Sequence, residues 1–166
     1  METTLERIVQ IGIRHTLEDL NNAFCYYLDH GDIDGLIDLF CKDAIYSHGT
    51  RVSRGREEIR QLFQNRNQAG TRTSRHLQTG LRTQRKGADK ATGTSVCLTF
   101  AADAAPPITP ASPYLVADFI DTYRRCADGR WRIEKRQIDR IFTSPENTAP
   151  VGANTAAANI SKRTMP

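Results

Sequence analysis

LDHGDIDGLIDLFCKDAIY, residues 28–46, is the stretch that decides the fold we predict for this chain. Gly31 is suited to end a helix, because the residue after the last turn commonly takes a left-handed conformation. Asp32 then caps a second, short helix. The apolar residues of that helix are Leu36, Leu39 and Phe40. The next residues, AIYSHGTRV (44–52), predict a strand.

Upstream, the chain has the apolar stripe of an amphipathic helix. Apolar residues recur there at steps of three and four: Leu17, Leu20, Phe24, Tyr27 and Leu28. This spacing places them on one helix face. The pattern extends back weakly through Ile8 to Leu5, so we expect one long or kinked N-terminal helix.

Downstream, one more helix and then a series of strands are predicted. SRGREEIRQLFQNR (53–66) predicts the helix, with its buried side formed by Ile59, Leu62 and Phe63. Strands are predicted over residues 72–85 and 91–102. The prolines of residues 103–113 cannot donate to a strand ladder, so this loop must leave the sheet.

The last predicted element is a β-hairpin. YLVADFIDTYRRC (114–126) is separated from RWRIEKRQIDRIF (130–142) by the turn signal Asp128-Gly129. Helices followed by a run of strands favour an α+β fold, with the helices packed on one face of the sheet. We predict one domain over residues 1–143 and a flexible C-terminal tail over residues 144–166. A sheet wrapped around helices leaves a concave mouth, which is a default small-molecule site.

Composition excludes several classes of protein. The chain has 166 residues, which suits one domain, and no run of about 18 apolar residues that a membrane span needs. Its first residues lack the pattern of a signal peptide, so we expect a cytoplasmic protein with no membrane partner. Free thiols are expected at all four cysteines: Cys25, Cys41, Cys97 and Cys126. No phosphate loop or metal-ligand spacing occurs, so we expect neither cofactor nor metal.

The positive charge does not indicate a nucleic-acid partner. The net charge is +4, but basic residues are scattered and acidic residues lie among them. The densest basic stretch is 72–86, whose arginines do not share one strand face and are better explained as a solvated strand surface. An acidic small-molecule substrate is compatible with this charge but is not required by it.

Three stretches resemble the SnoaL-like, nuclear-transport-factor-2-like superfamily. They are residues 28–46, RGREEIRQLF (54–63) and DGRWRIEKRQI (128–138), in the order found in that superfamily. The resemblance implies a cone-shaped, cystatin-like fold with a curved antiparallel sheet wrapped around N-terminal helices. The superfamily includes scytalone dehydratase, lindane dehydrochlorinase, ketosteroid isomerases, polyketide cyclases and small subunits of dioxygenases. The fold therefore does not choose the function.

Asp29 and His76 are the candidate catalytic pair. An aspartate that accepts the imidazole N–H fixes its tautomer and makes the other nitrogen a better general base. Asp29 ends the first helix and His76 begins a long strand, and both can face the mouth. The resemblance implies the Asp–His pair with which scytalone dehydratase and lindane dehydrochlorinase remove a proton. The alternative is a capping aspartate beside a buried histidine.

Tyr46 and His48 share one face of the first strand, since residues two apart point the same way. A tyrosine hydroxyl at the pocket can stabilise developing negative charge, whereas a core aromatic is the alternative. The resemblance places His48 at the position of the catalytic aspartate of ketosteroid isomerases and Phe24 at that of their oxyanion-hole tyrosine. Both departures count against the steroid isomerase mechanism.

Three further residues are candidates for contacting the substrate. Arg136, on the last strand, resembles a family arginine that contacts the substrate, and its fork could hold an oxygen. A surface salt bridge explains it equally well. Tyr27 continues the helical stripe, and Phe100 is expected to supply apolar wall or core.

These residues favour a cofactor-independent lyase, of the dehydratase kind, acting on a small, largely apolar ring substrate. A double-bond isomerase or a polyketide cyclase using the same pocket is the first alternative. A non-catalytic β-subunit of a ring-hydroxylating dioxygenase, or a ligand-binding module, is the second. The resemblance implies a homo-oligomer, either a trimer or a dimer.

Overall fold

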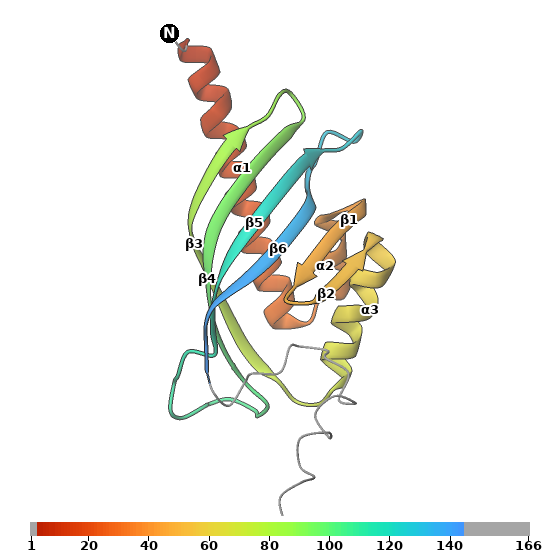
Figure 1. Cartoon of the computed structure of the whole chain (residues 1–166), viewed down its shortest axis with the longest axis vertical. Helices are drawn as coiled ribbons and strands as arrows, with labels where there is room; N and C mark the ends of the chain where they lie inside the picture. The colour runs from red at the N-terminus through yellow and green to blue at the C-terminus, as the bar shows by residue number, and fades with distance from the viewer. Residues whose placement is uncertain (1–2, 145–166) are drawn as a thin grey trace, which may run out of the picture.

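The structure, a computed structural model, describes residues 3–144, which form a curved sheet with helices against its inner side (Figure 1). The expected tail lies outside the described residues, apart from Ser144. The helices are α1 (Thr4–His30), α2 (Ile33–Asp38) and α3 (Gly55–Gln68). The strands are β1 (Phe40–His48), β2 (Arg51–Arg54), β3 (Thr73–Arg85), β4 (Lys90–Ala102), β5 (Leu115–Arg125) and β6 (Trp131–Thr143).

Helix α1 is one continuous helix whose two halves have different surroundings. Its second half buries the predicted stripe, including Leu17, Phe24 and Leu28, against the sheet. Its first half extends beyond the strands, where Leu5 and Ile8 are exposed (Figure 1). No helix in residues 3–144 has the length and apolarity needed to cross a membrane.

The predicted boundary between the first two helices is confirmed. Gly31 has φ of 74°, in the left-handed region that favours glycine, and its N–H donates to the carbonyl oxygen of Tyr27. The side chain of Asp32 then accepts from the N–H of Gly35 at 2.9 Å and caps α2. These local signals lead the chain directly from α1 into α2 and β1.

The sheet has the order β2-β1-β6-β5-β4-β3 and is antiparallel except for one pair. Strand β1 runs parallel to β6, with a register shift between Phe40 and Ile45. The strand predicted over residues 44–52 is two strands, because a turn at Gly49 folds β2 back on β1. The predicted α+β class, with its antiparallel-dominated sheet, is confirmed.

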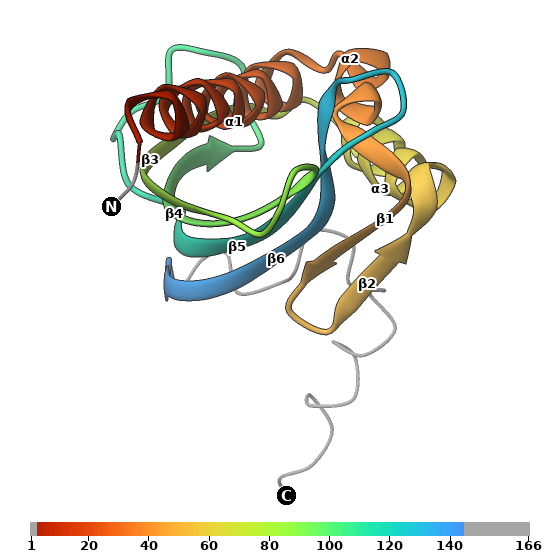
Figure 2. The ribbon, with the colours of Figure 1, turned by 90° about the horizontal axis from the view of Figure 1, so that it is seen from above.

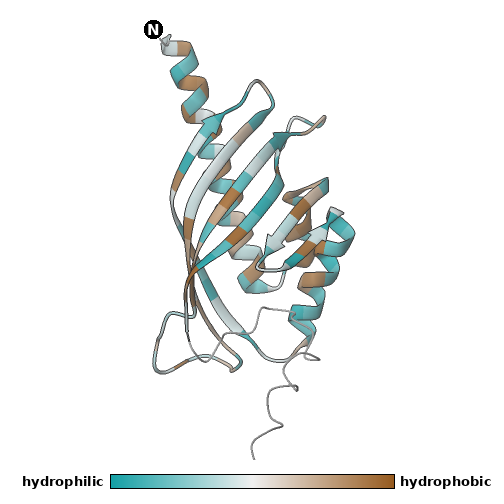
Figure 3. Ribbon diagram, in the orientation of Figure 1, coloured by the Kyte–Doolittle hydropathy of each residue, from teal (hydrophilic) through white to brown (hydrophobic). Residues whose placement is uncertain are grey.

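The hairpin of β5 and β6 and the proline-rich loop are also as predicted. Strand β5 pairs antiparallel with β6, and Gly129 in the turn has φ of 78°. Residues 103–113 form no strand and connect β4 to β5 outside the ladder. Burial alternates along β4, and Figure 3 shows the matching alternation of apolar and polar residues along the strands.

The curvature of the sheet encloses an aromatic core. Figure 2 shows α1 lying across the concave side of β3 to β6, with α3 beside β1. Five aromatic rings meet there edge to face at centroid distances of 5.5 to 6.3 Å: Phe24, Phe40, Tyr46, Phe63 and Phe119. Edge-to-face packing is favourable for aromatic pairs. Several of these rings also line a cavity.

Candidate active site

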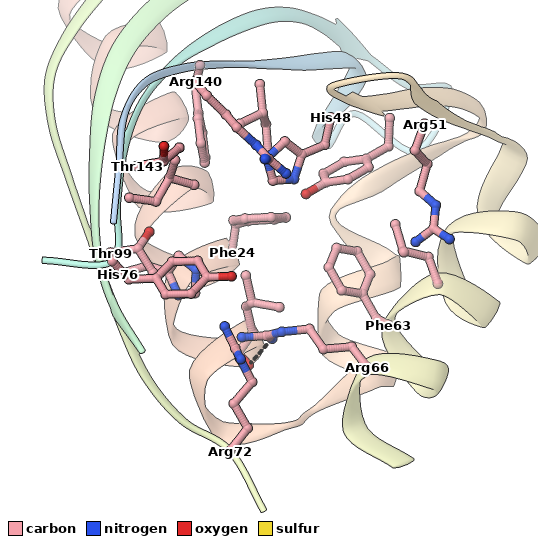
Figure 4. A pocket seen from close by; sticks show the side chains of 17 residues that line it. Phe24, His48, Arg51, Phe63, Arg66, Arg72, His76, Thr99, Arg140 and Thr143 are labelled. Carbon is pink, nitrogen blue, oxygen red and sulfur yellow. Dashed lines mark hydrogen bonds between the residues drawn. The ribbon is translucent and has the colours of Figure 1, made fainter. Parts of the chain in front are cut away.

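A narrow cavity of about 70 Å³ lies between the sheet and the helices (Figure 4). Its apolar walls are formed by Phe24, Leu28, Leu62, Phe63, Leu115, Phe119 and Ile138. Its polar lining is formed by Tyr46, His48, Arg51, Arg66, Arg72, His76, Thr99, Tyr114, Arg140 and Thr143. Helix α1, helix α3 and all six strands contribute residues, so the cavity exists only after the sheet has closed around the helices.

His76 and Asp29 meet at the wall of this cavity. Nδ1 of His76 lies 2.6 Å from Oδ1 of Asp29, and the two side chains are 12% and 4% exposed. The backbone N–H of His76 donates to Oδ2 of Asp29 at 2.8 Å, and the hydroxyl of Ser74 donates to Oδ1 at 2.7 Å. The end of α1 and the start of β3 thus hold the carboxylate with three hydrogen bonds.

These bonds determine the charge of Asp29 and the tautomer of His76. Burial raises the pKa of Asp29, but the hydrogen bonds and charge of His76 outweigh it, so the pKa lies below its usual value. The carboxylate is therefore ionised and requires a proton on Nδ1 of the imidazole. When His76 is neutral, the lone pair that can accept a proton is therefore on Nε2. His76 itself lines the cavity.

Tyr46 and His48 both line the cavity, as their shared strand face predicted. Burial raises the pKa of Tyr46 to about 12, so its hydroxyl stays a proton donor at neutral pH. Nε2 of His48 lies 3.0 Å from Nε of Arg140, which donates to it. Burial and the charges of Arg140 and Arg51 lower the pKa of His48 to about 4. His48 is consequently a neutral residue whose Nε2 is occupied.

Phe100 and Tyr27 do not belong to the lining of this cavity, contrary to the sequence prediction. On β4 the lining residue is Thr99, and adjacent strand residues point to opposite faces of a sheet. Tyr27 is half-buried and packs on α2, where its ring approaches Gly35. Phe24 and Leu28 are the α1 residues that reach the cavity.

Arg136 is the third correction, because it lies behind the cavity wall and not in it. Its side chain is fully buried, and its Nε and Nη2 donate to the two carboxylate oxygens of Asp121 at 2.9 and 2.7 Å. Its guanidinium carbon lies 4.3 Å from the ring centre of Phe24 and 4.7 Å from that of Phe119. These two rings separate it from the cavity, so neither substrate contact nor a surface salt bridge describes it.

Asn21 and Tyr123 complete the cluster around Arg136 and Asp121. Asn21 accepts from Nη2 of the arginine and donates to the hydroxyl of Tyr123, which in turn donates to Asp121 at 2.7 Å. Sequence reasoning did not find this cluster. The sequence does contain one indication of it, because Asp121 lies on the same face of its strand as the apolar residues Phe119 and Tyr123.

Sequence reasoning also missed the arginines of the cavity. Arg66 follows Ile59, Leu62 and Phe63 at helical steps, so the buried side of α3 continues onto it. Arg140 shares its strand face with Ile138 on β6, and both line the cavity. Arg72 carries no such signal, since it lies between α3 and β3. Its position follows from where the two elements dock.

The four cysteines are free, as expected, and three of them are buried. Sγ of Cys41 lies 3.7 Å from Sγ of Cys126, and burial raises the pKa of Cys41 to about 11. Within residues 3–144, no group of three or more His, Cys, Asp and Glu side chains is arranged to hold a metal ion.

Solved structures share this fold at low sequence identity. A protein from Novosphingobium aromaticivorans, provisionally named scytalone dehydratase, is 20% identical over 86% of this chain and 91% of its own, with a TM-score of 0.72. A protein of unknown function with a cystatin-like fold from Nostoc punctiforme is 23% identical over 88% and 99%, with a TM-score of 0.68.

A third similar structure belongs to a different class of protein. It is the β-subunit of a provisionally named aromatic-ring-hydroxylating dioxygenase from Novosphingobium aromaticivorans, 14% identical over 82% and 94%, with a TM-score of 0.68. Identities this low establish the fold and leave the activity open. No curated protein matches the chain.

The family is established by the sequence itself. The model of the SnoaL-like domain matches residues 10–137, which include most of α1, the Asp29–His76 contact and most of the sheet. This match covers well over half of the chain. The protein therefore belongs to the SnoaL-like domain family.

Proposed function

We propose that this protein is a cofactor-independent lyase of the dehydratase kind, with His76 as general base. The observation that carries the proposal is the 2.6 Å contact between Nδ1 of His76 and Oδ1 of Asp29 at the cavity wall. A buried, ionised carboxylate on one imidazole nitrogen makes the other nitrogen a stronger base. Scytalone dehydratase, the provisional name of one similar structure, is in keeping with this chemistry.

The proposed step is the loss of water from a ring compound that carries a hydroxyl group β to a carbonyl. Nε2 of His76 takes the proton from the carbon next to the carbonyl. The electron pair of that C–H bond forms the new C=C bond as the C–O bond to the hydroxyl breaks. The imidazolium returns the proton to the departing oxygen, so that water leaves and the enzyme is unchanged. Asp29 stabilises the imidazolium in between.

Tyr46 is the proposed donor to the substrate carbonyl. Its hydroxyl keeps its proton, because burial raises its pKa to about 12. A neutral donor in a partly water-excluded cavity stabilises the enolate-like charge that develops on the oxygen. The neutral His48, with its proton on Nδ1, is a second donor at the same wall. The apolar rings of Phe24, Phe63 and Phe119 would hold the ring of the substrate.

A double-bond isomerase or a cyclase would use the same proton abstraction and differ in where the proton or electron pair goes. The discriminating experiment incubates the protein in D₂O with a panel of cyclic β-hydroxy ketones and cyclic β,γ-unsaturated ketones. A dehydratase gives the conjugated product, seen by ultraviolet absorbance. An isomerase gives deuterium incorporation and a shifted double bond without loss of water, both seen by NMR.

His76→Gln is the decisive variant, because it removes the base and keeps a polar side chain of similar size. We expect turnover to fall by about 10²- to 10⁴-fold, the usual contribution of a general base. His30→Gln changes an exposed histidine at the end of α1 and should keep full activity. Full activity of His76→Gln would exclude this mechanism.

The similarity to a dioxygenase β-subunit supports a second candidate, a non-catalytic subunit. Such a protein would catalyse neither proton exchange nor elimination with any ketone of the panel. It would also be expected to form a stable complex with a large subunit. Wild-type protein that leaves the whole panel unchanged in D₂O would favour this candidate.

A further inference from the structure

The charged side chains that line the cavity are all positive, and the proposed dehydratase chemistry does not use this charge. Four arginines line it, together with two histidines. Among the described residues of its lining there is no aspartate or glutamate. The carboxylate of Asp29, which adjoins it, is already held by three hydrogen bonds. A cavity for a purely apolar ring would not need several guanidinium groups, since their desolvation costs free energy.

Arg66 and Arg72 form the densest part of this charge. Figure 4 shows their guanidinium ends turned toward each other at one end of the cavity. Burial lowers the pKa of Arg66, and the charge of Arg72 lowers it further. The two positive charges repel each other in this half-buried site. An anion placed between them would instead attract both guanidinium groups.

Both arginines retain hydrogen-bond donors. A guanidinium has five N–H groups. Arg66 donates from Nη1 to the carbonyl of Leu28 and from Nη2 to the hydroxyl of Ser74. Arg72 donates from Nη1 to Asp103, whose side chain is 79% exposed. Nε of Arg72 is buried and has no hydrogen-bond partner among the described residues. A buried donor without a partner is costly, and a ligand oxygen would satisfy it.

This pair is connected to the catalytic pair through one hydroxyl group. Nη2 of Arg66 donates to Oγ of Ser74 at 3.1 Å, and Oγ of Ser74 donates to Oδ1 of Asp29 at 2.7 Å. The same Oδ1 accepts from Nδ1 of His76. A group bound by Arg66 is thus anchored to the structure that orients the base.

We infer that the substrate is a ring compound bearing a carboxylate, and that Arg66 and Arg72 bind this carboxylate at the end of the cavity. Two guanidinium groups match the planar, bidentate geometry of a carboxylate. The aromatic walls take the ring, and His76 faces the carbon that loses its proton. This inference rests on the proposed function for the role of His76, but the binding of the acid is independent of it.

The test is a binding comparison between acids and their amides. The probes are benzoate and 1-naphthoate, each against its uncharged amide, titrated by calorimetry into the full chain at pH 7 and low salt. We expect at least one acid to bind about 10-fold more tightly than its amide, because a charged partner roughly doubles hydrogen-bond strength. Equal affinities for both pairs would overturn the inference. So would inorganic phosphate binding as tightly as the acids, since the ring would then contribute nothing.

Substitutions test whether Arg66 and Arg72 cause the preference for the acid over the amide. Arg72→Gln should reduce the acid-to-amide ratio to within about threefold, and Arg66→Gln should do the same if it folds. Arg75→Gln is the matched control, since Arg75 is exposed on β3 and lies outside the cavity lining. An unchanged ratio in Arg72→Gln would overturn the inference.

A variant that binds the acid more tightly separates a direct contact from a loss of affinity caused by disturbed folding. Asp103→Asn removes the carboxylate that competes for Arg72 and should tighten the binding of the acid by about two- to fivefold, with the amide unchanged. A looser binding of the acid would count against the site. Wild-type protein that prefers the acids to their amides but eliminates water from no β-hydroxy ketone of the panel would reject the proposed function alone.

Discussion

Two acid–base clusters lie on the inner side of the sheet, and they differ in what surrounds them. Asp29 and His76 stand at the wall of the cavity, and His76 is 12% exposed. Asp121 and Arg136 lie behind Phe24 and Phe119 and are fully enclosed. The first pair has an imidazole face available to a ligand. The second pair has no such access, because its arginine is covered by the two aromatic rings and donates to Asn21.

The comparison shows that a charged residue on an inward strand face is not by itself a site. Both pairs join a carboxylate to a nitrogen group: Asp29 and His76 lie 47 positions apart in the chain, whereas Asp121 and Arg136 face each other across the hairpin of β5 and β6. Burial is advantageous to catalysis only where a reacting atom can also reach the base. In this protein that condition separates a candidate active site from a structural ion pair. The following predictions test the separation.

The largest expected effect is on stability, at the enclosed pair. Arg136→Met leaves the carboxylate of Asp121 buried without its counter-charge, and we expect the free energy of unfolding to fall by about 3–5 kcal/mol. Lys135→Met, at an exposed position one residue away on β6, should change it by less than about 0.5 kcal/mol. Urea denaturation measures both. Equal stabilities of the two variants would contradict the structural role of the pair.

Asp29→Asn should affect both stability and turnover. The amide cannot accept all three hydrogen bonds as a carboxylate does, so we expect a loss of about 2 kcal/mol near neutral pH. Because the native pKa of Asp29 lies below its usual 3.8, its contribution is present above that value and is lost as the pH falls through the native pKa. Wild type and variant should therefore converge in stability at low pH.

Turnover in Asp29→Asn should fall less than in His76→Gln, by about 10- to 100-fold, since the base remains but loses its orienting charge. Ser74→Ala, which removes one of the three hydrogen bonds to Asp29, should have a smaller effect of the same kind. Convergence of the stabilities at neutral pH instead of at low pH would contradict an ionised Asp29.

The last expected effect is on the pH dependence of stability and concerns His48. Its native pKa of about 4 lies below the ordinary 6.5, so the unfolded chain binds the proton first as the pH falls. The wild type should lose about 2 kcal/mol of stability between pH 6.5 and 4, allowing for partial exposure. His48→Asn should remove most of this slope, whereas His30→Asn, at an exposed position, should keep it. Thermal unfolding across this pH range measures the difference.

Most of the element order was predictable because its signals are local. Gly31 and Asp32 mark the end of one helix and the start of the next, and Asp128-Gly129 marks the hairpin of β5 and β6. The contact of Asp29 with His76 was also predicted, but through the family resemblance. Spacing alone carries no information on two residues 47 positions apart.

What the sequence alone determined, then, is the succession of helices and strands, since capping, turn chemistry and alternation act over a few residues. Only the tertiary structure decided that β1 runs parallel to β6, that Arg136 is enclosed, and that Arg66 and Arg72 converge on one cavity. Those outcomes depend on how the curved sheet docks on α1 and α3. Docking is a property of surfaces assembled from distant parts of the chain, and no local pattern encodes it.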